Sequence, residues 1–212
     1  MAKTKKKLKK GKLVVFLLII LFIGFGCVFM FKKKPKNVPV SVQTEVIDTI
    51  DSFDYQLNDN ETEYYNELFN SLKDLLGNDD YDEEEYALLI SKLFLTDFYD
   101  LNNKVMKSDV GGTQFVYSEY RSDFELGAID SVYKYVQSNV YGDRKQELPI
   151  VKSIEKVDIY TDSFEYNYDI DYDAYYVTLN INYDVDLGYP SQVKLVLIHN
   201  DNKLEIAKME TL

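Results

Sequence analysis

The sequence predicts an α+β domain joined to one N-terminal transmembrane helix. Three observations lead to this prediction: an unbroken apolar run near the N-terminus, helical periodicity from about residue 60, and an apolar period of two after Ile150. Amphipathic helices and alternating strands both need a partner for their apolar faces. We therefore expect about three helices packed on a curved antiparallel sheet of four to five strands.

The apolar run covers residues 13–31, which are 19 consecutive residues without a charge. At about 1.5 Å per residue, a helix of this length matches the roughly 30 Å hydrocarbon core of a bilayer. The single cysteine, Cys27, lies inside the run and follows Gly26, as the acylated cysteine of a bacterial lipoprotein would. Gly24 and Phe25 do not fit that signal, so we expect Cys27 to be an inert apolar residue.

Lysines on the two sides of the run predict its orientation. Seven lysines lie in residues 1–12, and four lie in residues 32–40, a linker that also contains Pro35 and Pro39. An excess of lysine marks the cytoplasmic side of a membrane helix. We therefore expect a basic cytoplasmic tail over residues 1–12 and an extracytoplasmic domain over residues 41–212, in a single-pass protein of the cell membrane.

The chain after Lys36 is strongly acidic, with 13 Lys and Arg against 36 Asp and Glu, a net charge of 13 − 36 = −23. A surface that neutralises phosphates needs clustered lysine and arginine, so this composition excludes nucleic acid as a partner. The expected partners are the lipid bilayer and other membrane or cell-envelope proteins.

Helical spacing and end signals predict the first two helices. A capping pair of Asn60 with Glu63 begins the first helix, and Gly77 ends it. Asp82 begins the second helix, which holds its spacing over five turns to Val105. The apolar stripes comprise Tyr65, Leu68, Leu72, Leu75 and Leu76 in the first helix, and Tyr86, Leu89, Ile90, Leu93, Phe94, Phe98, Leu101 and Val105 in the second.

A third helix is expected after the turn at Gly111-Gly112. Its stripe mixes aromatic with small residues, which suit close packing, and Gly127 is expected to bend it. The members of this stripe are Tyr120, Phe124, Gly127, Ala128, Ser131 and Tyr135.

Alternation of apolar and polar residues predicts the strands. The clearest strand covers residues 175–185, with Tyr175, Val177, Leu179, Ile181, Tyr183 and Val185 on one face. Further strand-like segments are expected at 154–161, 164–170, 193–198 and 204–209. The turn Asn200-Asp201-Asn202 makes the last two a closing hairpin. Residues 41–58 fit neither period, although Phe53, Tyr55 and Leu57 favour a short strand.

Three helices followed by a meander that ends in a hairpin give an order of elements that resembles the nuclear transport factor 2-like α+β cone. The order also looks like the periplasmic domain of the membrane-anchored assembly component of type IV secretion and conjugation systems. The resemblance covers roughly residues 60–212 and rests on architecture, so it transfers no functional residue. Residues 41–58 and 162–173 depart from the simplest form of this pattern.

Sequence motifs for chemistry are weak throughout. His199 is the only histidine, precedes a turn, and has only Asp201 as a nearby carboxylate in sequence, so a partly exposed strand residue is favoured over a catalytic base. Gly111-Gly112 lacks the lysine and spacing of a phosphate loop. We therefore expect no catalytic residue, no cofactor and no enzymatic activity. A buried carboxylate pair with strongly shifted titration would indicate an enzyme instead.

The acidic clusters predict no metal site. Asp169, Asp171 and Asp173 have calcium-loop spacing, but Ala174 stands where the loop needs glycine and Asn180 where it needs an acid. The acidic run 79–85 suits the start of a helix, where the dipole favours anions. Weak cation binding by that run is the alternative.

The chain contains 19 tyrosines, its most unusual feature. Those at helical or strand period are expected in the core, and those on the opposite faces are candidates for binding. The core candidates are Tyr65, Tyr86, Tyr120, Tyr135, Tyr175 and Tyr183. The binding candidates are Tyr64, Tyr160, Tyr172, Tyr176 and Tyr189.

Two functions follow from these features. The first is a non-catalytic, membrane-anchored interaction or scaffold domain outside the cytoplasm. The alternative is a ligand-binding module that holds a small molecule, glycan or peptide in a tyrosine-lined pocket.

Overall fold

The structure is a computed structural model that describes residues 44–212. The expected tail 1–12, transmembrane helix 13–31 with Cys27, and linker 32–40 lie outside the described residues. Among residues 44–212, no helix has both the length and the apolar character needed to cross a membrane.

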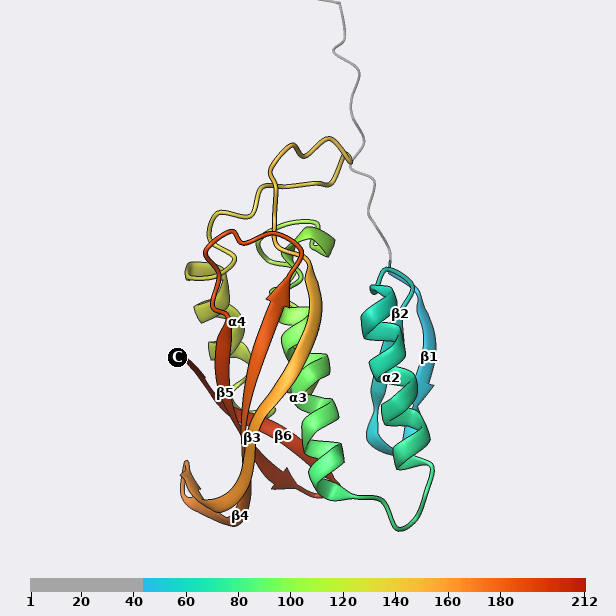
Figure 1. The fold of residues 1–212 in the computed structure, drawn as a ribbon, viewed down its shortest axis with the longest axis vertical. Coiled ribbons are helices and arrows are strands. Elements are labelled where there is room, and N and C mark those ends of the chain that lie inside the picture. The colour runs from blue at the N-terminus through green and yellow to red at the C-terminus, as the bar shows by residue number, and fades with distance from the viewer. Residues whose placement is uncertain (1–43) are drawn as a thin grey trace, which may run out of the picture. The chain divides into compact units, whose positions relative to one another are not determined.

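The described chain forms a β-hairpin, then three α-helices, then a four-stranded antiparallel sheet (Figure 1). This order confirms the α+β class. The sheet is a simple meander with the strand order β3-β4-β5-β6, because each strand pairs with its neighbour in sequence.

The N-terminal hairpin consists of β1 (Val46–Ile50) and β2 (Tyr55–Asn58). Only the second of these strands was indicated by the sequence. Asp54 makes the tight connection in the left-handed conformation, at φ 49°. Tyr55 of β2 is buried, and its hydroxyl lies 2.7 Å from that of Tyr86 in the second helix, so the hairpin joins the main core.

Helices α2 (Glu63–Leu76) and α3 (Glu83–Tyr99) form an antiparallel pair. The hydroxyl of Thr62, rather than Asn60, caps α2 by accepting from the Tyr65 N–H at 3.2 Å, and Gly77 ends the helix as expected. A carboxylate oxygen of Asp82 caps α3, accepting from the Glu84 N–H at 2.9 Å. The acidic run before α3 is therefore a helix start.

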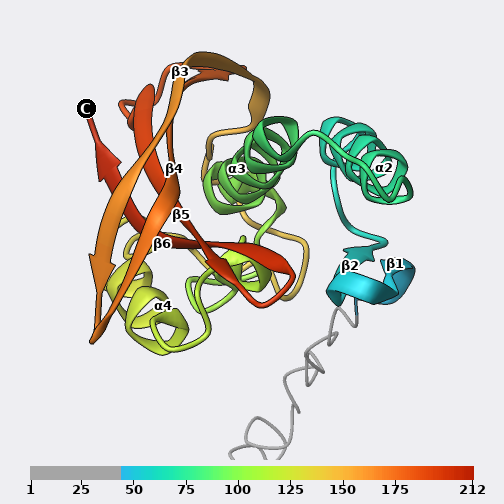
Figure 2. The ribbon, with the colours of Figure 1, turned by 90° about the horizontal axis from the view of Figure 1, so that it is seen from below.

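From Tyr86 onward, helix α3 is buried on nearly all sides rather than along one stripe. Figure 2 shows it between the sheet and α2. A helix that is apolar around its circumference suits this central place. Helix α2 packs mainly on α3 and reaches the sheet through Tyr64, whose hydroxyl accepts from the Ile154 N–H at 3.0 Å. The prediction that helices cover one face of the sheet therefore holds most directly for α3.

The predicted extension of the second helix to Val105 is wrong. Helix α3 ends at Tyr99, and a short 3₁₀ helix, η2 (Leu101–Asn103), follows it. Asp and Asn side chains compete for local backbone groups, and the three residues Asp100, Asn102 and Asn103 occur here within four positions. The turn brings Lys104 inward, where it is buried.

Helix α4 (Arg121–Asp130) confirms the third predicted helix, and its stripe packs on the core at Tyr120, Phe124 and Ala128 but not at Gly127 or Tyr135. Tyr135 lies beyond the helix with 75% of its surface exposed. No atom lies within 4 Å of a Cβ added at Gly127, so that glycine permits no close contact. Phe124 attaches α4 to α3 through ring contacts with Phe94 and Phe98, at 5.7 and 5.2 Å between centroids.

The sheet consists of β3 (Val151–Tyr166), β4 (Asp169–Tyr183), β5 (Gln192–Asn200) and β6 (Lys203–Thr211). The predicted face of β4 is confirmed up to Tyr183, because Val177, Leu179 and Ile181 are buried. The closing hairpin is confirmed as β5 and β6.

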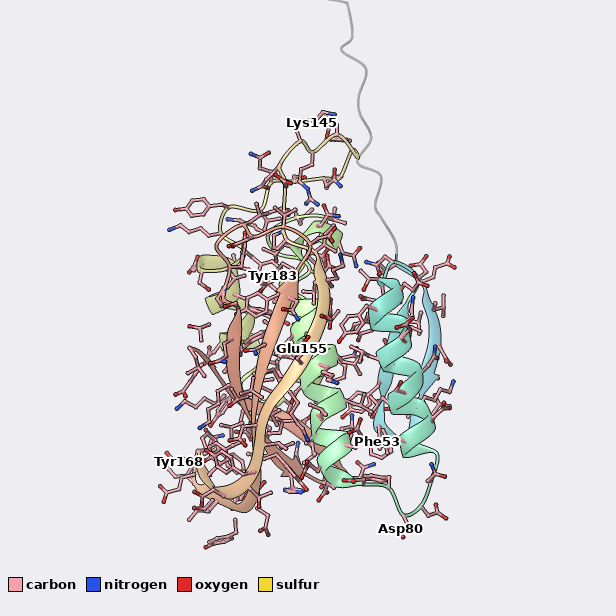
Figure 3. All side chains as sticks on the ribbon, viewed as in Figure 1. Phe53, Asp80, Lys145, Glu155, Tyr168 and Tyr183 are labelled. Carbon is pink, nitrogen blue, oxygen red and sulfur yellow. The ribbon has the colours of Figure 1, made fainter. Side chains whose placement is uncertain are left out.

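Strands β3 and β4 form one long hairpin, so the segment 164–170 is the tip of this hairpin rather than a separate strand. Asn167 turns the chain at φ 51°, and Tyr168 points away from the protein at the tip (Figure 3). Register shifts at three places along β3 and β4 increase the local twist, and both strands bend (Figure 1).

Candidate functional site

The candidate functional site is a polar pocket at the C-terminal end of α3, with a volume of about 250 Å³. Its walls come from parts of the chain far apart in sequence: residue 44, residues 56–61 at the end of β2, Asp97 of α3, and residues 104–114. We call it the polar pocket.

A buried ion pair forms the inner wall of the polar pocket. Lys104 is 4% exposed, and its ammonium group donates to Oδ1 of Asp97. Burial by itself lowers the pKa of Lys104, but the charge of Asp97 and the hydrogen bond to it, together with Tyr133 and Glu61, outweigh burial and hold the pKa above its usual value. Taking two charges out of water costs several kcal/mol per ion, so such a pair adds little stability. A buried pair beside a cavity therefore suggests a function.

The Gly111-Gly112 pair holds the second oxygen of Asp97. The Gly112 N–H donates to Oδ2 of Asp97 at 2.6 Å, and Gly112 has a φ of 75° that favours glycine. A Cβ at Gly111 would overlap the carbonyl group of Asp97. The pair is thus a turn, as expected, and it also lets the backbone approach the carboxylate.

Three further side chains hold the walls of the pocket. The Tyr133 hydroxyl accepts from the Gly111 N–H at 3.0 Å and donates to the Phe98 carbonyl at 2.7 Å. Gln114 accepts from the backbone N–H of Gln56 at 2.9 Å, which joins the loop to β2. The guanidinium of Arg144 donates to the Lys104 carbonyl at 2.7 Å. The walls are therefore fixed before any ligand binds.

Glu61 supplies the group in the polar pocket that can exchange a proton near neutral pH. Burial, and then repulsion from Asp97, raise the pKa of Glu61 from 4.5 to about 8. Burial likewise raises the pKa of Asp100 to about 6. The buried Oδ1 atom of Asn60, next in sequence to Glu61, has no hydrogen-bond partner among the described residues.

His199 lies at the other end of α3, beside a more open groove of about 680 Å³. Oδ2 of Asp171 accepts from the His199 backbone N–H at 2.7 Å and lies 2.9 Å from its Nδ1. These hydrogen bonds hold the pKa of Asp171 below its usual range, although burial opposes them. Nε2 of His199 lies 3.3 Å from a carboxylate oxygen of Glu83. The prediction of a partly exposed strand residue is confirmed, since 36% of the side chain is exposed.

Tyrosines line this groove, which we call the tyrosine groove. Tyr166, Tyr172 and Tyr175 contribute to it, together with Glu83 and the segment 170–173. The Tyr175 hydroxyl donates to Glu83 at 3.2 Å, and burial, followed by that charge, raises the pKa of Tyr175 to about 12.

The candidate tyrosines divide between three places. Tyr172 lies in the tyrosine groove and is 73% exposed. The rings of Tyr160 and Tyr176 stack with 5.1 Å between their centroids, on the face of the sheet opposite α3. The ammonium group of Lys194 lies over both rings. Tyr64 and Tyr189 pack against the core.

The structure confirms the predicted core position for some of the tyrosines and not for others. Tyr65 and Tyr86 are 1% exposed, which confirms them as core residues. Tyr120, Tyr175 and Tyr183 are partly buried against the core. The prediction for Tyr135 is wrong, and Tyr133 is buried in its stead.

The acidic motif of β4 does not form a loop, because Asp169, Asp171 and Asp173 lie within a strand. Over residues 44–212, no group of three or more His, Cys, Asp or Glu side chains is arranged to hold a metal ion.

Comparisons of the chain with protein-family models, with curated proteins and with solved structures give no match. The resemblance to the nuclear transport factor 2-like cone therefore stays a prediction.

Sequence reasoning does not single out Glu61, Asp97 or Lys104 as site residues. The one signal that points to their site is Gly111-Gly112, because adjacent glycines often mark a close backbone approach. The partners of His199 are likewise remote in sequence, at 28 positions for Asp171.

Proposed function

We propose that this chain is a single-pass membrane protein that presents a non-catalytic binding domain outside the cytoplasm. We further propose that the tyrosine groove binds a positively charged segment of a partner protein. The observation that carries the proposal is the lining of the groove, in which three tyrosines stand beside the carboxylates of Glu83, Asp171 and Asp173.

Charge supports a basic partner. Three carboxylates face one histidine in the groove, and the chain after Lys36 carries a net charge of 13 − 36 = −23. A field of one sign speeds the approach of an oppositely charged partner. Tyrosine rings also attract lysine and arginine through their faces, by about 0.5–1 kcal/mol at exposed sites.

The arrangement of the side chains supports binding rather than catalysis. Both ring nitrogens of His199 lie against carboxylates, so neither is directed at a substrate. In the polar pocket, Glu61 and Asp97 are a carboxylate pair of the kind that suggests an enzyme. However, Asp97 already accepts from Lys104 and from the Gly112 N–H, one bond to each oxygen. Asp97 is therefore not free to act as the second carboxylate of an acid–base pair with Glu61.

The test uses full-length protein in lipid nanodiscs and a fluorescent lysine-rich peptide. Tyr172→Ala should weaken binding about two- to fivefold without changing the charge of the domain, while Tyr135→Ala, an exposed tyrosine outside the groove, should leave binding unchanged. Fluorescence anisotropy measures both. The matched control matters because an acidic domain attracts any basic peptide. Equal affinities for the wild type and Tyr172→Ala would reject the groove as the binding site.

A second function, binding of a small ligand, is favoured by the polar pocket. A cavity with a fixed wall, a buried ion pair and an unpaired acceptor has the features of a built ligand site. This function does not depend on the tyrosine groove, because the pocket and the groove share no lining residue.

A further inference from the structure

We propose that the polar pocket binds the protonated amino group of a small organic amine, held by Asn60, Glu61 and Asp109. This inference rests on the second function, binding of a small ligand in the pocket, and names the class of ligand.

Hydrogen-bond acceptors without donors support an amine. Oδ1 of Asn60 is buried and lacks a partner among the described residues, and a buried acceptor left unpaired costs about 1–3 kcal/mol. Glu61 and Asp109 line the same cavity. Oδ2 of Asp109 already accepts from the Val105 N–H at 2.8 Å, which fixes its position. An ammonium group has three donors and no acceptor, so it complements this set.

The pocket holds more carboxylates than cations. Lys104 is paired with Asp97, and across residues 44–212 neither Glu61 nor Asp109 has a basic partner within 4 Å. The carbonyl end of α3 adds a partial negative charge nearby, and its last turn contains no basic residue. A cationic ligand would therefore supply the charge that this end of the molecule lacks.

The geometry favours an organic cation over a metal ion. Over the described residues, no group of three His, Cys, Asp or Glu side chains is placed to hold a metal. The cavity of about 250 Å³ is also much larger than a single ion and can hold the carbon chain of an amine.

Proton exchange by Glu61 supports the same ligand. The charged groups that face Glu61 are Asp97 and Asp100 of the α3 end, Lys104, and Asp109. With burial, the three acids raise the pKa of Glu61 to about 8, against the effect of Lys104. A bound ammonium group favours the ionised carboxylate, so binding should release a proton at neutral pH.

Isothermal titration calorimetry of the full-length protein with propylammonium tests the proposal. Affinity should rise up to tenfold between pH 6 and pH 7, because one proton is released per ligand. Repeating the titration in buffers of different ionisation enthalpy measures that proton. Glu61→Gln should weaken binding at least tenfold and abolish the release, whereas Glu67→Gln, on the exposed face of α2, should change neither.

Matched probes separate the failure of the inference from failure of the second function. Propan-1-ol and butyrate have the same propyl chain with a neutral or a negative end, and calcium represents a metal ligand. If one of these probes binds and propylammonium does not, the proposal of an amine ligand is overturned, but the pocket remains a site for a small ligand. Absence of heat with all four probes would overturn both. Tyr172→Ala should bind propylammonium like the wild type, since the tyrosine groove lies at the other end of α3.

Discussion

The two ends of α3 carry acidic side chains in opposite circumstances. At the N-terminal end, Asp82 caps the helix, and Glu83 and Glu84 stand in the favourable field of the helix dipole and in contact with solvent. At the C-terminal end, Asp97 is partly buried at the unfavourable end of the dipole and is compensated by Lys104, which is buried. An acid at the N-terminal end of α3 therefore costs little free energy, whereas an acid at the C-terminal end depends on a compensating partner.

The largest change in stability is expected from a substitution that breaks the ion pair between Asp97 and Lys104 at the C-terminal end of α3. Asp97→Asn should destabilise the protein by about 3–5 kcal/mol, because it leaves Lys104 buried without a counterion. Glu84→Gln at the other end removes an exposed ion pair with Lys156 and should cost less than about 1 kcal/mol. Urea unfolding measures both. The double variant Asp97→Asn with Lys104→Met should recover part of the loss, and equal losses at the two ends would contradict the comparison.

The dependence of stability on pH tests the acidic side chains at the C-terminal end of α3 separately. The pKa of Glu61 is about 8 in the folded protein and about 4.5 as an ordinary glutamate, so folding favours its protonated form. The resulting stability is complete below about pH 4.5 and is lost as pH rises through 8, by up to about 1.4 kcal/mol per pH unit. Glu61→Gln should remove this loss. The difference in unfolding free energy between variant and wild type should therefore grow from pH 5 to pH 8; a constant difference would argue against the raised pKa.

The smallest effects test how tightly the polar pocket is built. Gly111→Ala places a Cβ against the carbonyl of Asp97 and should cost about 1–3 kcal/mol. Gly127→Ala in α4 meets open space, and should instead gain about 1 kcal/mol, since alanine is the better helix former. Thermal unfolding compares the two. Similar changes for both glycines would mean that the loop at Gly111 moves away without cost.

Local rules predict the parts of this fold that depend on neighbouring residues. The cap at Asp82, the stop at Gly77 and the alternation in β4 all lie within a few residues of the structure that they determine. The end of α3 could not be predicted in this way. Lys104 turns inward to meet Asp97 seven residues earlier, and the apolar spacing of Leu101 and Val105 conceals that turn.

The candidate site is harder to predict from the sequence than the fold. Its polar side chains come from separate segments, and each residue type is common in a chain with 36 acids. Sequence patterns do not identify Glu61, because the shift in its pKa arises from burial and from Asp97, which is 36 positions away. Tyr172, one of the binding candidates that the sequence indicates, does line a groove.

The contact between Gly111 and Asp97 offers a way to recognise related chains. Asp97, Lys104 and Gly111 are each seven positions apart, so the pocket leaves a linear signature, D-x₆-K-x₆-G-G. Any side chain at the first glycine would force the loop onto another path. A genome search for this spacing behind an apolar N-terminal run would therefore collect sequences able to form the same ion pair and glycine turn, and would reject those that share only the acidic composition.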